Sequence, residues 1–529
     1  MTYPIVQAND LTSMGVTITP PSYVQGVDDK NIGLLAQLIM QWQAKRARNR
    51  LKTDYWNGKH KLDHIGFSIP PALRKLEEVV GWPAKAVQAH AERCMFDGFV
   101  SKNDSDDPYG IQRTLVENRF DIELPMAITS TMVHSCAFIA VTPGKVEAGE
   151  PEVLVTAKSA QWASGLWNPR TRALDAAFAV NEADDYGRPT EMTLYTTDRT
   201  IRMRNTSTGW KLIDEHSHGL NRVPVEPLVY RPTLDRPFGS SVISRPVMSI
   251  TDDAVRTVLR SETSAEFYSA PQYLLLGADP DSFKDDAGNP IPVWEFIIGR
   301  INLLSKDEDG DVPKIEQISQ QSVQPHIEQL RELACRFSGE TNVPVSSLGV
   351  VTDNPSSAEA MHAAEKDLVI DCAAATRVFG AALRRVGQDI VMMRSDGPNE
   401  MDDELATLTA RWRNPALPSV IDAGDAMVKL IGAFPWMAET TVALEEVGFT
   451  DEQITRLLAE KRRNQARNSL DALLQAGGVD GGDSRRKPDT KQDRDRAIGA
   501  VTEPSSQTRE TGVGANLDGT GWTASTSSA

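Results

Sequence analysis

Hydrophobic positions recur at helical spacing over long stretches of the chain. Leu35, Leu38 and Trp42 follow the period of an amphipathic helix, which we expect over 30–56, with Gly58 as its stop. Similar patterns predict shorter helices at 71–80, 83–95 and 123–135. The first part of the chain is therefore expected to be largely helical.

Between residues 137 and 230 the pattern changes to short runs of β-branched and aromatic residues. Turn residues separate these runs, as at 185–189 and 205–209. Strands are predicted at 137–141, 153–157, 174–180, 192–197, 201–204 and 210–213. Runs of this kind, divided by turn residues, predict an antiparallel meander.

Two helices that flank a small insertion come next. One is predicted to run to about residue 270 with Ser244 as its N-cap, and the second to return over 325–337. The insertion between them, 271–321, contains turn residues and strand-like runs at 273–276 and 296–304.

The last part of the chain is again helical in pattern. After a loop at 343–355, a capping box at 356–359 opens a helix expected to continue to about residue 393. A helical segment over 401–475 follows. Beyond residue 477 the apolar periodicity stops, which predicts a disordered tail.

The net charge of -17, from 56 basic and 73 acidic residues, argues against a general nucleic-acid binder. Residues 30–95 depart from this balance, with twelve Lys or Arg against five Asp or Glu. The basic positions of the first helix form either a solvated face or an interaction patch. They are Lys45, Arg46, Arg48, Arg50 and Lys52.

Cysteine spacing and the apolar pattern bear on the compartment. The four cysteines lack C-x-x-C spacing and are expected to be reduced thiols; they are Cys94, Cys136, Cys335 and Cys372. The first 29 residues contain no Lys or Arg, and no uninterrupted apolar stretch is long enough to span a membrane. We therefore expect synthesis in the cytosol and no membrane partner.

Motifs for enzymatic chemistry are absent from the sequence. It contains no G-x-x-x-x-G-K-[ST] phosphate loop, no G-x-S-x-G elbow and no H-E-x-x-H. His60 and His64 lie four apart, but Gly58 disfavours a helix there, and the calcium-loop-like stretch 305–316 begins with Ser305 instead of Asp. We predict no catalytic residues, no cofactor and no metal site.

Several strings, taken together and in order, resemble the portal (head–tail connector) proteins of long-tailed bacteriophages, especially those of actinobacteria. They are spread over roughly 30–475, and neither the first 29 residues nor the tail contributes. The strings are 55–64 (YWNGKHKLDH), 69–73 (IPPAL), 80–83 (VGWP), 236–240 (RPFGS), 264–268 (SAEFY), 339–349 (GETNVPVSSLG) and 353–359 (DNPSSAE).

The resemblance implies an α+β, mainly α-helical portal fold, with a wing of helices plus an antiparallel β-meander, paired stem helices, a small α/β clip, a tunnel loop and a helical crown. The implied parts are an N-terminal arm (1–29), wing (30–240, β-rich over 137–230), first stem helix (241–270), clip (271–324), second stem helix (325–341), tunnel loop (342–356), long wing helix (357–400), crown (401–475) and disordered tail (476–529).

The implied function is a non-enzymatic ring, typically of about twelve subunits, at one capsid vertex of the virion, assembled in the host cytoplasm. Double-stranded DNA would pass through the ring non-specifically during packaging and ejection. Other implied partners are the terminase large subunit, the head-completion adaptor, and the major capsid and scaffold proteins. The missing phosphate loop argues against the terminase motor itself, and a minor capsid or scaffold-like head protein without a channel is the alternative.

Candidate residues follow from this implied architecture. Residues 241–341 hold 17 acids and 9 bases, which would let DNA slide without being held. Arg256 and Arg260 are candidate channel-lining residues of the stem. The candidate DNA-facing residues of the tunnel loop are Val350, Val351, Thr352, Asp353 and Asn354. The candidate clip contacts for the terminase or adaptor are Asp307, Glu308, Asp309 and Asp311.

Overall fold

The computed structural model describes residues 18–62, 78–102, 107–268, 273–276, 314–317, 322–350, 358–394, 397, 400–416, 420–449 and 451–476. Two compact units are present, Met1–Pro435 and Trp436–Ala529, and each is described by itself. Most of the helix predicted at 71–80, the strand predicted at 296–304 and the tail lie outside the described residues.

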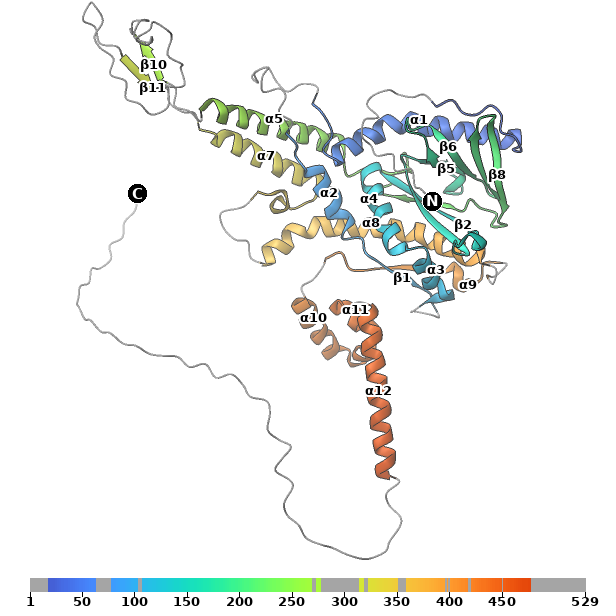
Figure 1. Cartoon of the computed structure of the whole chain (residues 1–529). Coiled ribbons are helices and arrows are strands. Elements are labelled where there is room, and N and C mark those ends of the chain that lie inside the picture. The colour runs from blue at the N-terminus through green and yellow to red at the C-terminus, as the bar shows by residue number, and fades with distance from the viewer. Residues whose placement is uncertain are drawn as a thin grey trace, which may run out of the picture. The chain divides into compact units, whose positions relative to one another are not determined.

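The first unit combines long helices with short antiparallel strands (Figure 1). Its helices are α1 (Asp29–Trp56), α2 (Trp82–Ala91), α3 (Ile111–Glu117), α4 (Phe120–His134), α5 (Arg245–Tyr268), α7 (Gln324–Thr341), α8 (Ala358–Met393), α9 (Asp403–Ala406) and α10 (Val420–Ala433). Short 3-10 turns are η2 (Pro108–Gly110), η3 (Val146–Ala148) and η5 (Val345–Leu348).

The strands extend beyond most of the predicted runs. They are β1 (Phe96–Val100), β2 (Cys136–Pro143), β3 (Val153–Ser159), β4 (Ala163–Asn168), β5 (Ala173–Ala183), β6 (Pro189–Tyr195), β7 (Arg199–Thr206), β8 (Gly209–Ser217), β9 (Val225–Val229), β10 (Tyr273–Leu276), β11 (Lys314–Gln317) and β12 (Thr409–Trp412).

The predicted antiparallel meander is present over 163–217, but the strands of 137–230 divide into two sheets. One has the order β4-β5-β6-β7-β8 and the other β3-β2-β9. The central strand β2 pairs with the distant β9, as in Ala137 opposite Leu228. Sequence reasoning missed β4 and β9, which contain Gly165 and Pro227, residues that are depleted in strands.

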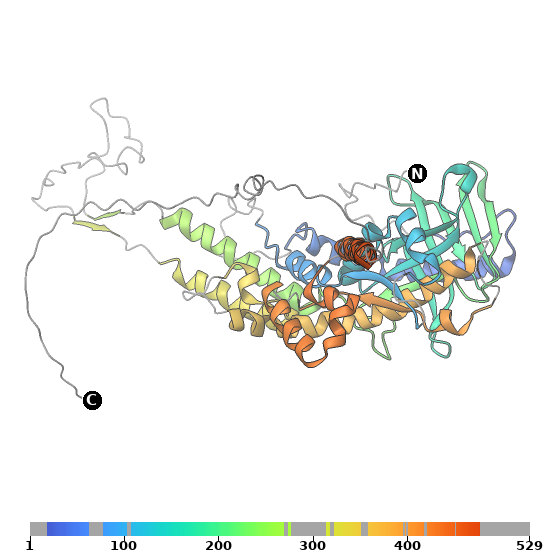
Figure 2. The same cartoon turned by 90° about the horizontal axis from the view of Figure 1, so that it is seen from below.

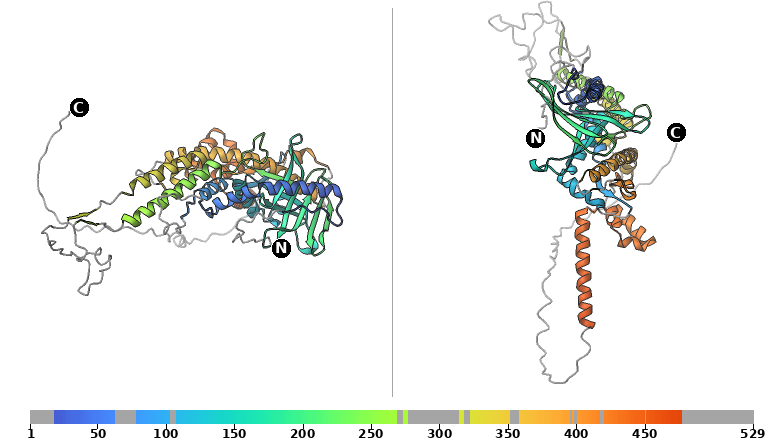
Figure 3. Two further views of the ribbon diagram at one scale, coloured as in Figure 1. Left: turned by 90° about the horizontal axis from the view of Figure 1, so that it is seen from above. Right: turned by 90° about the vertical axis from the view of Figure 1, so that its right-hand side faces the viewer.

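The two sheets and α1 form successive layers. Leu35, Leu38 and Trp42 of α1 pack on one face of the five-stranded sheet, where the Trp42 and Phe178 rings meet at 5.7 Å. Figures 1 and 3 show α1 lying along this sheet. The opposite face packs against the three-stranded sheet through residues such as Phe138 and Ala177. Because successive side chains of a strand point to opposite faces, Ile139 of β2 points away from this layer, into a second and larger core.

The main core joins the three-stranded sheet to α2, α4, α8 and the bases of α5 and α7. Its members include Ile139 of β2, Phe379 of α8 and Phe337 of α7, each at most 1% exposed. The long helix α8 therefore buries an apolar stripe under the sheet and also reaches the two helices that follow the β-rich region. One continuous core thus positions every element of the candidate site.

The helical expectation for 401–475 is wrong at residues 409–412, which form β12. This strand pairs in antiparallel fashion with β1, as in Ala410 opposite Phe99. The Trp412 ring lies 5.6 Å from Phe96 and 6.2 Å from Phe379. The pairing joins segments about 300 residues apart, which local periodicity does not report.

The second unit contains η6 (Pro435–Glu439, which begins at its boundary), α11 (Thr441–Val447) and α12 (Asp451–Ala476). Ala443 of α11 and Ile454 of α12 are buried where the two helices pack, whereas residues 460–469 are exposed. Among all described helices, none is both long and apolar enough to cross a membrane.

Candidate functional site

The helices α5 and α7 lie side by side and extend away from the sheets (Figures 1 and 2). Ser244 caps α5 as predicted, since its hydroxyl accepts from the Val247 amide at 3.4 Å, and Pro246 occupies the first turn. Near the far end, the Ser264 hydroxyl lies 3.4 Å from Nε2 of His326 in α7. We call this antiparallel pair the stem hairpin.

Only the base of the stem hairpin is built into the core. Val247 and Ala254 of α5 and Leu333 and Phe337 of α7 are buried, and the Phe337 ring meets Trp82 of α2 at 5.5 Å. By contrast, α7 buries no side chain between residues 324 and 332. The outer half of α7 therefore lacks the apolar packing that normally holds a helix in place, although α5 still buries Leu259 and Thr263 in its outer half.

The loop between β9 and α5 is held by a close backbone approach. Gly239 has φ +70°, and a Cβ there would lie 2.1 Å from the Tyr230 carbonyl oxygen. The Ser240 amide donates to the same oxygen at 2.9 Å, and the Ser241 hydroxyl donates to the Val133 carbonyl of α4 at 2.6 Å. The string 236–240 thus contains a glycine that this turn requires.

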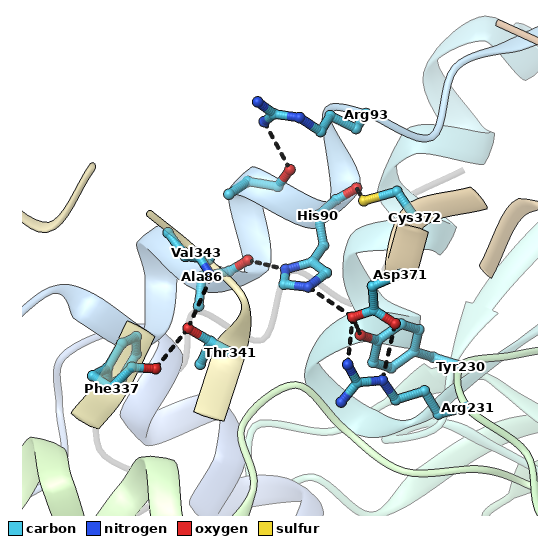
Figure 4. Close-up of polar contacts among 11 residues, drawn as sticks. Ala86, His90, Arg93, Tyr230, Arg231, Phe337, Thr341, Val343, Asp371 and Cys372 are labelled. Carbon is cyan, nitrogen blue, oxygen red and sulfur yellow. Dashed lines mark hydrogen bonds and ion pairs between the residues drawn. The ribbon is translucent and has the colours of Figure 1, made fainter. Parts of the chain in front are cut away.

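A buried polar network, shown in Figure 4, lies where this loop, α2 and α8 meet. Its centre is Asp371 of α8, which is 9% exposed. The carboxylate accepts hydrogen bonds from the Tyr230 hydroxyl at 2.6 Å, Nε of Arg231 at 3.0 Å and Nε2 of His90 at 3.1 Å. Nδ1 of His90 lies 2.8 Å from the Ala86 carbonyl, so both of its ring nitrogens face oxygen acceptors.

The electrostatics identify Asp371 as a structural anion. Its burial would raise its pKa, but hydrogen bonds from His90, Tyr230 and Arg231 outweigh burial and lower the pKa to about 2. Burial and the Asp371 charge together raise the pKa of Tyr230, so its hydroxyl remains a donor. Donors from His90, Tyr230 and Arg231 engage both oxygens of this carboxylate, so its contacts are structural. The arrangement can clamp three elements together.

A second link joins α1 directly to the stem hairpin. The Tyr55 hydroxyl at the end of α1 donates to Oδ1 of Asp252 in α5 at 2.8 Å. The His60 ring stacks on Tyr55 with centroids 4.1 Å apart, and its Nε2 lies 3.8 Å from the same carboxylate oxygen. The string 55–64 therefore supplies a contact between the end of α1 and the stem hairpin.

A second charged cluster connects β9 to α8. Nε of Arg222 donates to Oδ1 of Asp389 at 2.7 Å, and Nε of Arg385 lies 2.7 Å from Oε1 of Glu226. Both carboxyls are buried, Asp389 completely. Burial raises the pKa of Glu226 to about 8 and that of Asp389 to about 6, and the two arginines offset it only in part.

The two predicted stem arginines lie one turn apart on α5. At 100° per residue, Arg256 and Arg260 are on the side of the helix away from Val247 and Ala254. Arg256 forms an ion pair with Asp253 at 2.5 Å, whereas Arg260 is half-buried and forms no hydrogen bond or ion pair within the described residues. The two positions are therefore not electrostatically equivalent.

Most of the other predicted site residues lie outside the described part of the chain. These are Val351, Thr352, Asp353 and Asn354 of the tunnel loop and Asp307, Glu308, Asp309 and Asp311 of the clip. Val350, the one described member, is half-buried and packs against the main core after η5. In the clip region β10 pairs with β11, a strand that the sequence pattern did not reveal.

Sequence reasoning also missed Asp371, although a signal was present. Leu368, Cys372, Ala375 and Phe379 form a buried stripe on α8, and Asp371 falls within it. A lone carboxylate on the apolar side of a helix indicates a buried partner elsewhere in the chain. Only the folded structure shows which residues pair with Asp371.

The four cysteines are free thiols, three of them buried and Cys335 exposed. Within the described segments, no group of three or more His, Cys, Asp or Glu side chains is arranged to hold a metal ion. His64 and the stretch 305–313 fall outside these segments.

The sequence is similar to those of phage portal proteins. The model of a family described as "Phage portal protein, SPP1 Gp6-like" matches residues 35–467. The portal protein of Mycobacterium phage D29 is 25% identical over 418 residues, which cover 78% of this chain and 85% of that protein. The portal protein of Mycobacterium phage L5 is 27% identical over 386 residues, covering 72% and 78%.

Among solved structures, a chain from "Virion of native gene transfer agent (GTA) particle" matches with a TM-score of 0.39 and 13% identity. The match covers 67% of this chain and 85% of that one. The family match rests on sequence.

Proposed function

The chain belongs to the SPP1 Gp6-like family of phage portal proteins, and on that premise we propose that it assembles as a closed ring of about twelve subunits at one capsid vertex. The ring is the conduit for double-stranded DNA during packaging and ejection. Its role is structural and non-enzymatic, within the virion, after assembly in the host cytoplasm.

The stem hairpin is the observation that carries this proposal. Its base is anchored in the core, yet its outer half buries no side chain of α7 before Leu333. Helices of this kind gain packing when neighbouring copies place their own hairpins beside them, as around a channel. We therefore assign α5 and α7 to the channel wall.

The charge of the proposed channel is uneven along its length. α5 carries four acidic and three basic residues, and α7 carries three acidic and two basic residues. Each helix is therefore nearly neutral. The residues between them, 269–323, carry ten acids and four bases. The acidic excess thus belongs to the clip, where few phosphate contacts would form and DNA could pass without being retained.

Within this assembly we assign contacts to the predicted residues. Val351, Thr352, Asp353 and Asn354 narrow the channel and touch DNA sterically, while Val350, which packs against the main core, anchors the start of this loop. The acidic clip residues contact the terminase large subunit during packaging and the head-completion adaptor afterwards, while the outer surface of the ring meets the major capsid and scaffold proteins. The clip residues assigned to these contacts are Asp307, Glu308, Asp309 and Asp311.

Negative-stain electron microscopy of the purified chain tests the proposal. Rings with a central hole are expected. Their consistent absence would favour a minor capsid or scaffold-like head protein without a channel. Deleting 350–354 separates the parts of the proposal, because packaging should be impaired while rings still form; loss of the rings would mean that the loop is a structural element.

A further inference from the structure

The basic face of α1 is more buried than a solvated charge run would be. Lys45, Arg48 and Lys52 are spaced i, i+3 and i+7, so they lie on one side of the helix. Lys52 is only 8% exposed, and Lys45 is half-buried. Nζ of Lys45 is 5.3 Å from the centre of the Phe238 ring, which brings the loop that precedes α5 onto this face.

The Lys52 side chain is largely buried, its ammonium still reaches solvent, and no counter-charge lies beside it in the described residues. It forms no hydrogen bond or ion pair with any residue that the structure describes. Its neighbours are the positive charges of Arg48 and Arg236, and burial together with these charges lowers the pKa of Lys52 to about 8. No carboxylate in the described residues acts in the opposite direction on Lys52.

The nearest acidic group cannot serve as that counter-charge. Lys45, Arg48 and Lys52 all lie close to the thiol of Cys136 at the start of β2. Burial raises the pKa of Cys136 to about 11, so the thiol is neutral at physiological pH. A largely desolvated ammonium among other cations is unfavourable, and proteins normally place a carboxylate near such a charge.

We propose that Lys45, Arg48, Lys52 and Arg236, the α1 cation cluster, form one half of an intersubunit ion-pair site. Carboxylates of a neighbouring copy of this chain complete it. The inference rests on the proposed ring and names a contact that the ring requires. Arg48 and Arg236 are exposed, whereas Lys52 is largely buried.

Two observations favour a second copy of this chain over a free phosphate or DNA. Leu234, two residues before Arg236, is 100% exposed, and a fully exposed leucine beside a charge cluster fits the surface of a folded partner. The chain also carries 73 acidic residues against 56 basic ones, so a neighbouring copy offers carboxylates in excess. A phosphate backbone would use the cations but not the leucine.

Lys52→Met tests the inference because its two expected effects have opposite signs. Methionine fills similar space without a charge, so the melting temperature of the isolated chain at low concentration should rise. Ring formation, followed by mass photometry over a concentration series, should require about tenfold more protein or higher. Arg236→Glu should weaken rings as well, while Arg50→Gln, on the opposite exposed side of α1, should change neither measurement.

Four outcomes would overturn the inference. A lower melting temperature for isolated Lys52→Met would mean that Lys52 is paired within its own chain. If Lys52→Met forms rings at the same protein concentration as the wild type, the proposed ion-pair interface is refuted. The proposed function would still stand. Stabilisation of the wild type, but not of Lys52→Met, by millimolar inorganic phosphate would assign the cluster to a free anion. A wild-type chain that never forms rings would refute the proposed function and this inference together.

Discussion

The hydroxyl of Tyr230 donates a 2.6 Å hydrogen bond to Asp371, and this contact joins the end of β9 to the middle of α8. The next residue, Arg231, pairs with the same carboxylate before the chain continues toward α5. The path into the stem hairpin is therefore fixed to the longest helix of the first unit.

Replacing Asp371 with alanine should destabilise the fold by about 3 kcal/mol, because it leaves Arg231 and His90 without their buried acceptor. The free energy of unfolding in urea measures the effect. Glu365→Ala, also on α8, is the matched control: its partly exposed ion pair with Arg93 should be worth about 1 kcal/mol or less. Equal losses in the two variants would contradict a special role for Asp371.

The Asp371 network should make the fold sensitive to strong acid. The pKa of Asp371 is about 2 in the folded chain and about 3.9 when unfolded, so its contribution is complete above pH 4. That contribution is lost as the pH falls toward 2. Urea unfolding of wild type and Asp371→Ala between pH 5 and 2 should show their stabilities converging; a constant difference would contradict the network.

Gly239→Ala should lower the melting temperature strongly, because the new Cβ would approach the Tyr230 carbonyl oxygen to 2.1 Å at a φ of +70°. Gly33→Ala, inside α1 with open space around its Cβ, should instead stabilise the chain by about 0.5–1 kcal/mol. Differential scanning calorimetry of both variants tests the pair. Tolerance of Gly239→Ala would mean that the loop before α5 is not held as described.

The cluster at Glu226 predicts the opposite pH dependence. Its folded pKa of about 8 exceeds the unfolded value of about 4.3, so stability falls as the pH rises through this window. Glu226→Gln resembles the protonated form and should lose less stability between pH 5 and 8 than the wild type. Glu215→Gln, at a more exposed position on β8, is the control and should follow the wild type.

Neutralising the stem arginines should affect DNA movement unequally. Arg260→Gln is expected to change the packaging rate or the retention of packaged DNA, because Arg260 forms no ion pair within the described residues. Arg256→Gln should have a smaller effect, since Arg256 is already paired with Asp253. Particles assembled with each variant can be compared by DNA content; two variants indistinguishable from wild type would remove both residues from the channel wall.

Local pattern determined most of the helices. Apolar spacing placed α1, α5, α7 and α8 within a few residues of their observed ends, and Ser244 caps α5 as predicted. These features depend on neighbours three or four positions away, which a single sequence displays. The ordered strings in 55–359 also indicated the family, which the match over 35–467 confirms.

Only the tertiary structure decided which distant segments meet. The division into two sheets depends on β9 returning to β2, and β12 exists as a strand because it pairs with β1. The burial of Asp371 and Lys52 likewise depends on elements far along the chain. A charged residue on a helix has the same local pattern whether it faces water or a core. What distinguishes the two is the partner across space: three donors surround Asp371, and no described group neutralises Lys52.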